Sequence, residues 1–124
     1  MKRFKTVLCL ILAVICVFSV TAFAANSFEF NLVTTGVDYS AAAKKANDKS
    51  FASVDVLKAN NYAYRYAVAT GIRTDYVTGW KEVVGKDSFD LNYYSKPSRN
   101  TSLRLHGSTS SASGTSTIQG TWIP

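Results

Sequence analysis

Cysteine is almost missing from this chain, because its two cysteines, Cys9 and Cys16, both lie in one apolar run near the N-terminus. Residues 25–124 contain no thiol. This excludes a disulfide framework, a thiolate metal site and a cysteine nucleophile from that part of the chain. A cysteine-free domain of this size must be held together by core packing alone, which suits a bacterial exported protein better than a small secreted animal domain.

Motifs for catalysis or cofactor binding are also missing. His106 is the only histidine, and no G-x-S-x-G nucleophile motif accompanies it. It falls on the polar side of its predicted strand beside a Ser/Gly-rich loop, so we expect an exposed strand-end histidine. The acidic residues are scattered and form no calcium-loop pattern. The sequence therefore predicts a non-enzyme with no catalytic residue, metal or cofactor.

Excess charge is small once the N-terminus is set aside. The net charge is +6, but Lys2, Arg3 and Lys5 precede the apolar run. The remaining 11 basic and 8 acidic residues leave +3. This mild excess is compatible with attraction to anionic cell walls or lipid, and it is too small to indicate a nucleic-acid partner.

The chain has only one long hydrophobic run, at residues 7–18, and it has the layout of an export signal. A basic start precedes the run, and the small side chains of Ala22 and Ala24 follow it. We expect cleavage before Ala25, which makes residues 1–24 a helical signal peptide and residues 25–124 a secreted, extracellular β domain with no stable membrane span. The alternative is an uncleaved anchor, since residues 7–25 are just long enough to span a membrane.

Alternating apolar and polar residues recur along the rest of the chain and predict strands. They are expected at residues 28–32, 52–56, 62–76, 80–84, 89–93, 103–106 and 116–122. Gly71 is expected to mark a bend in the longest of them. The fold class is therefore all-β, a single antiparallel β-sandwich or small barrel of about seven strands. Residues 38–49 depart from this pattern and are expected to form one or two helical turns or an exposed loop.

Three tyrosines form the candidate binding face. Tyr62, Tyr64 and Tyr66 occupy alternate positions of one predicted strand and should stand side by side on one face. If that face is exposed, it is a rigid aromatic platform for a sugar or a protein partner. If it is buried, the row is part of the core. Arg65, on the opposite side with several alanines, prefers water and leaves the first possibility open.

The overall layout resembles the small exported β proteins of Gram-positive bacteria, among them the lactococcin-like bacteriocins. The features that carry the resemblance are the Lys-rich start, the Ala-x-Ala site, the cysteine-free remainder and the terminal Gly120-Thr121-Trp122. The resemblance implies a secreted non-enzyme that binds a cell-envelope component or a protein partner, as a bacteriocin does. The alternative is a structural extracellular protein that self-assembles through an edge strand.

Overall fold

The computed structural model describes residues 24–32, 36–109 and 116–124. Most of the predicted signal peptide, including Ala22, lies outside this range, while Ala24 and Ala25 are exposed at its start. Every regular element in the described residues is a strand. None of these residues belongs to a helix long and apolar enough to cross a membrane.

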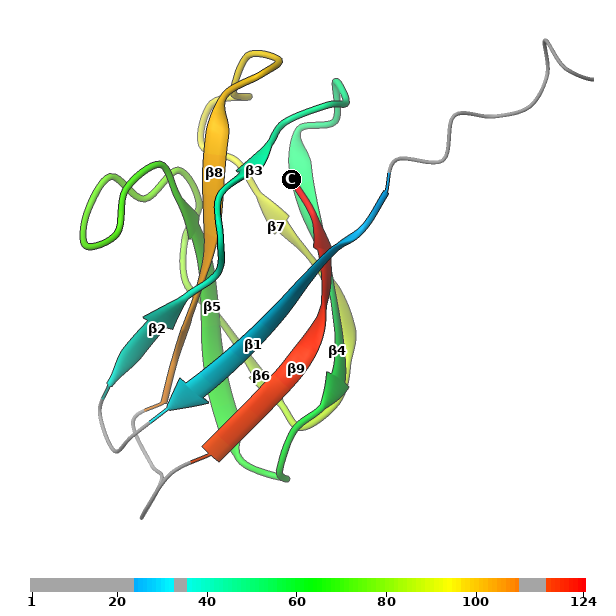
Figure 1. Cartoon of the computed structure of the whole chain (residues 1–124), viewed down its shortest axis with the longest axis vertical. Coiled ribbons are helices and arrows are strands. Elements are labelled where there is room, and N and C mark those ends of the chain that lie inside the picture. Colours follow the sequence, from blue (N-terminus) through cyan, green and yellow to red (C-terminus); the bar gives the residue numbers. More distant parts are fainter. Residues whose placement is uncertain (1–23, 33–35, 110–115) are drawn as a thin grey trace, which may run out of the picture.

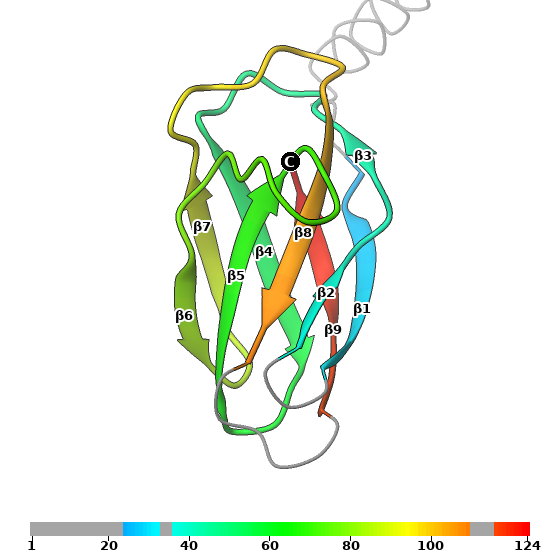
Figure 2. The same ribbon diagram turned by 90° about the vertical axis from the view of Figure 1, so that its left-hand side faces the viewer.

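Two antiparallel sheets face each other (Figures 1 and 2). The four-stranded sheet has the order β1 (Asn26–Leu32), β9 (Ser116–Ile123), β4 (Phe51–Lys58), β7 (Ser88–Asn92). The five-stranded sheet has the order β2 (Val37–Tyr39), β8 (Ser102–Ser108), β5 (Ala63–Ala69), β6 (Lys81–Val84), and β3 (Ala43–Lys44) also pairs with β8. The predicted all-β sandwich is therefore confirmed.

Each of the predicted strands is present, but the longest is shorter than expected. It ends at Ala69, and residues 70–75 form a turn closed by a hydrogen bond from the Thr70 amide to the Asp75 carbonyl. Asp75 adopts a positive φ of 67° there. The chain then returns antiparallel, so that Tyr76 lies opposite Ala69. Gly71 lies in this turn, which agrees with the expected bend.

The expected helical turns at residues 38–49 are wrong, because this segment contributes to β2 and β3 along the edge of β8. The loop alternative describes residues 40–42 and 45–49, but part of this loop is buried. The Ser40 amide donates to the Leu105 carbonyl, and the Lys45 amide donates to the Thr101 carbonyl. Lys45 is also buried: its Nζ donates to Asn47 Oδ1 at 2.9 Å and lies 4.9 Å from the centre of the Tyr93 ring. Burial lowers the pKa of this amine. Tertiary contacts thus override the local helix propensity.

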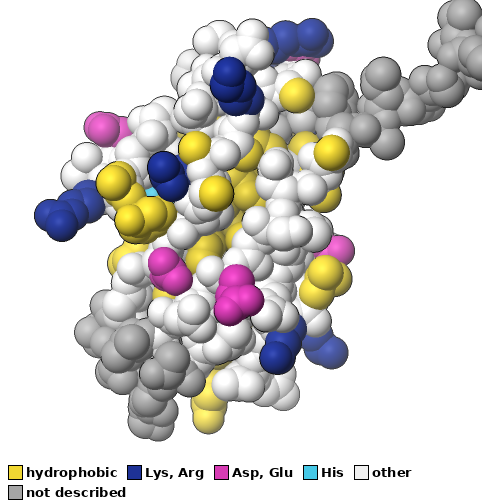
Figure 3. All heavy atoms as spheres, in the orientation of Figure 1, with side chains coloured by type: hydrophobic (Ala, Val, Ile, Leu, Met, Phe, Trp, Pro, Cys, Tyr) yellow, Lys and Arg dark blue, Asp and Glu magenta, His cyan; other side chains and the backbone are white. Residues whose placement is uncertain are grey.

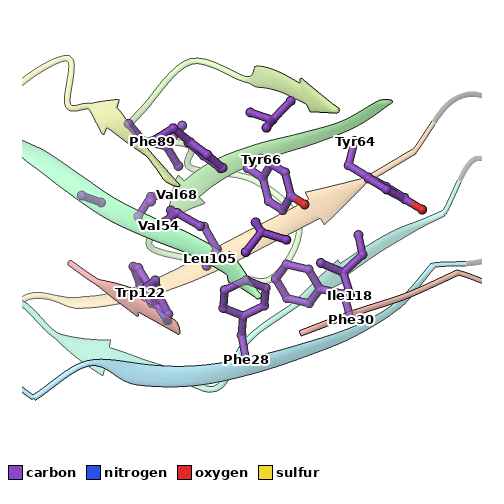
Figure 4. Packing of buried hydrophobic residues seen from close by; sticks show 14 of the residues in the cluster. Phe28, Phe30, Val54, Tyr64, Tyr66, Val68, Phe89, Leu105, Ile118 and Trp122 are labelled. Carbon is purple, nitrogen blue, oxygen red and sulfur yellow. The ribbon is translucent and has the colours of Figure 1, made fainter. Parts of the chain in front are cut away.

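The core lies between the sheets and is made by the inward rows of the strands (Figure 4). Phe28 and Phe30 of β1 pack against each other with ring centroids 4.8 Å apart. Trp122 is buried in step with Ile118, as the alternation predicts. The alternation thus identifies the core face of β1 and β9 correctly.

Two glycines allow these rings to reach their positions. A Cβ atom on Gly107 of β8 would lie 2.7 Å from Cε2 of Phe30, which belongs to the opposite sheet. A Cβ atom on Gly120 of β9 would collide with the backbone oxygen of Asp55 and lie 2.8 Å from Cζ of Phe28. Both positions therefore require the absence of a side chain for steric reasons.

Gly120→Ala is expected to lower the free energy of unfolding by about 1–3 kcal/mol or more, because neither a backbone oxygen nor a packed ring can yield cheaply. Denaturant unfolding measures the change. Gly79→Ala is the matched control, since a Cβ there meets only the Tyr94 hydroxyl at an ordinary 3.5 Å. Equal stabilities for the two variants would contradict this steric account.

Candidate functional site

The predicted tyrosine face is not exposed. Tyr64 and Tyr66 have 0% exposure and point between the sheets (Figure 4), where the Tyr66 ring packs 5.1 Å from that of Phe89. Tyr62 precedes β5 and is 51% exposed, apart from the other two. The binding platform of Tyr62, Tyr64 and Tyr66 is therefore wrong, and the core alternative describes Tyr64 and Tyr66 but not Tyr62. The reason is that the large rings fill the space between the sheets, which the small alanines of the other row could not fill.

The outward row of β5 is covered by the chain that follows it. Figure 2, which faces the five-stranded sheet, shows the turn after β5 lying in front of β8. Ala67 and Ala69 belong to this outward row, yet both are fully buried. Their small side chains leave room above the sheet for larger groups. The outer face of this sheet therefore carries a second packed layer.

Four rings form that layer, and we call them the aromatic row: Tyr39, His106, Tyr76 and Trp80. Tyr39 of β2 is directly opposite His106 of β8, which is opposite Ala67 of β5. Successive ring centroids along the row are 5.9, 5.2 and 5.0 Å apart. Tyr39 is 42% exposed, and the row thus runs from a buried centre to the surface.

A guanidinium group lies over each end of the aromatic row. Cζ of Arg104 is 5.5 Å from the Tyr39 ring centre, and Cζ of Arg65 is 5.6 Å from that of Trp80. Such contacts hold the planar cations in place. The ion pair found in the described residues joins Arg99 to Asp48, so neither of these two guanidinium groups is paired with a carboxylate there. We call the four rings and two arginines together the aromatic–arginine face.

His106 is buried, with 0% exposure, so the expectation of an exposed strand-end histidine is wrong. The turn after β5 covers it: Nε2 lies 2.9 Å from the Gly71 carbonyl oxygen, and Nδ1 lies 3.4 Å from the Tyr76 hydroxyl. Nε2 therefore donates to the carbonyl, and Nδ1 accepts from the hydroxyl. Burial lowers the pKa of His106; the bond to Gly71 opposes this shift, and Arg104 adds to it. The ring is a neutral packing centre, and its two nitrogens are occupied by the Gly71 carbonyl and the Tyr76 hydroxyl.

Exposed apolar side chains adjoin the aromatic–arginine face. Val37 lies on β2 two positions before Tyr39, and Ile72 follows Gly71; both are exposed. In Figure 3, hydrophobic side chains gather beside Lys or Arg side chains near the turn that follows β5. The sequence could have indicated this surface in one way: alternation places Arg65, Arg104 and His106 on the outward side of their strands.

The outer edges of the four-stranded sheet are each capped by a side chain from the other part of the sandwich. At β1, the Asn31 amide donates to Asp38 Oδ2 at 2.9 Å. At β7, Lys81 Nζ donates to the Asp90 carbonyl oxygen at 3.5 Å. Such caps occupy backbone groups that would otherwise pair with another strand.

No protein-family model matches this chain, and no curated protein or solved structure is significantly similar to it.

Tyr66→Phe is expected to leave the protein as stable as before or to stabilise it by up to about 1–3 kcal/mol, since a buried hydroxyl without a partner carries a desolvation cost. Among the described residues, the Tyr66 hydroxyl has no hydrogen-bond partner. Tyr94→Phe, at an exposed position, is the control and should change nothing. A clear loss of stability in Tyr66→Phe alone would show that the hydroxyl is satisfied after all.

Acidification is expected to destabilise the fold through His106. Unfolded chains protonate this histidine near pH 6.5, whereas the folded state does so only at lower pH. The free energy of unfolding should thus fall as pH drops through 6.5. His106→Gln should flatten that fall in thermal melts at different pH values, and no other histidine contributes. Identical pH profiles for the two proteins would contradict the assignment.

Proposed function

We propose that this protein is a secreted, non-enzymatic β-sandwich that binds an anionic component of the cell envelope through its aromatic–arginine face. One observation carries the proposal: Arg65 and Arg104 are each held over a ring and have no ion pair in the described part of the chain. A guanidinium group fixed in this way retains its outward N–H donors for a phosphate or carboxylate.

The rings supply the second part of the recognition. Tyr39 is partly exposed and rigidly placed, so contact with it costs little side-chain entropy. Val37 and Ile72 extend the apolar area beside it. Glu82 faces Arg65 across β5 and β6 but forms no ion pair with it in the described residues. A ligand that combines negative charge with apolar surface fits this face best.

The alternative function, self-assembly through an edge strand, has less support. The edge strands β1 and β7 are capped by Asp38 and Lys81, and β6 has only four residues. Short and capped edges are the features by which proteins avoid edge-to-edge pairing.

Loss of both guanidinium groups should strongly weaken envelope binding. We expect Arg65→Gln/Arg104→Gln to reduce cosedimentation with purified cell walls by at least about tenfold, because each charge-assisted hydrogen bond contributes about 1.5–3 kcal/mol. The matched control is Lys58→Gln/Lys96→Gln, which removes the same charge from exposed positions elsewhere. It should stay within about twofold of the parent protein.

Two results would count against the proposal. The first is equal loss of binding in both double variants, which would indicate attraction by net charge alone. The second is the absence of wall binding by the parent protein. Circular dichroism melts of all three proteins show whether each is folded, which matters because Arg104 also donates to the Ser40 carbonyl oxygen.

A further inference from the structure

The outer face of the four-stranded sheet is hollowed on the side of the sandwich opposite the aromatic–arginine face. One shallow hollow of about 380 Å³ extends from β7 across β4 to β9. A second, of about 500 Å³, extends from the end of β4 across β9 to β1. Thr121 of β9 lines both. The two hollows meet at Thr121 and together extend over all four strands, and we call the pair the transverse groove.

Three carboxylates line the transverse groove, and each is held by a neighbouring side chain. Asp55, Glu29 and Asp90 accept hydrogen bonds from Ser88, Gln119 and Ser53 at 2.8, 2.8 and 3.2 Å, respectively. Each bond uses one carboxylate oxygen. The second oxygen of each carboxylate has no hydrogen-bond partner among the described residues. These oxygens are positioned acceptors for hydroxyl groups.

The rest of the lining narrows the ligand class. Lys58 is the only basic residue on the strands of this face, and the Lys81 amine reaches the Asp90 carbonyl oxygen at the β7 edge. The three carboxylates outnumber these two amines, so the groove disfavours an anionic ligand. The described residues hold no group of three or more metal-ligating side chains. Leu57 and Ile123 add apolar contacts, one in each hollow. Carboxylate acceptors, hydroxyls and separate apolar contacts together match the hydroxyl groups and C–H faces of a sugar chain.

We infer that the transverse groove binds a neutral oligosaccharide lying across the strands, with sugar hydroxyls donating to Asp55, Glu29 and Asp90. Four neighbouring strands span about 14 Å, since adjacent strands lie about 4.8 Å apart. This length suits a short oligosaccharide rather than a single sugar. The site is separate from the aromatic–arginine face, and this inference does not depend on the proposed function.

Titration with chitohexaose and with cellohexaose, followed by amide chemical shifts in NMR spectra, tests the inference. Shifts are expected at Asp55, Gln119 and Thr121. Thr121→Arg should weaken the affinity at least about tenfold by filling the centre of the groove. Thr117→Arg is the matched control, because Thr117 lies on the same strand and face outside the groove and should bind like the parent protein.

A second variant keeps the test decisive if Thr121→Arg does not fold. Asp55→Asn/Glu29→Gln preserves side-chain size while weakening the acceptors, and it should also reduce the affinity. Arg65→Gln/Arg104→Gln should leave saccharide binding unchanged, which distinguishes this site from the aromatic–arginine face. The inference is overturned if neither saccharide shifts the groove amides, if shifts occur only at the aromatic–arginine face, or if Thr121→Arg binds like Thr117→Arg.

Discussion

The contact between Phe30 of β1 and Gly107 of β8 is the constraint on which the sandwich depends. It joins the two sheets, and it exists only because position 107 has no side chain. Phe28 rests on Gly120 in a similar way within the four-stranded sheet. Together with Tyr64 and Tyr66, these rings fill the space between the sheets. Since such interiors are close-packed, a ligand could bind only at the outer faces and ends of the molecule.

The sequence predicts this interior well because strands place alternate residues on opposite sides. The positions of Phe28, Phe30, Ile118 and Trp122 follow from that rule alone. It fails at residues 38–49, where alanines and lysines favour a helix locally. The outcome there is decided by hydrogen bonds to β8 and by burial of the Lys45 amine against Tyr93, and both depend on residues that are distant in the sequence. Local propensity carries no information about such partners.

The aromatic–arginine face could be predicted only in parts. Alternation places Arg65, Arg104 and His106 on the outward side of their strands. It cannot place Tyr76, which has the same sequence parity as Tyr66 but lies on the opposite face of the sheet, since the turn at residues 70–75 reverses the chain. Tyr64 and Tyr66 form a clear pattern in the sequence for the same reason that they are buried: a strand places its large apolar rings on one side.

The small net charge of residues 25–124 conceals a separation of charge between the two outer faces. Arg65 and Arg104 outnumber Glu82 on one face, and Glu29, Asp55 and Asp90 outnumber Lys58 on the other. Packed sheets are about 10 Å apart, and outward side chains add to this distance, whereas physiological salt screens charges over about 8 Å. A ligand at either face therefore encounters mainly the charge of that face. The net charge of the whole chain consequently underestimates how strongly each face can discriminate between ligands of different charge.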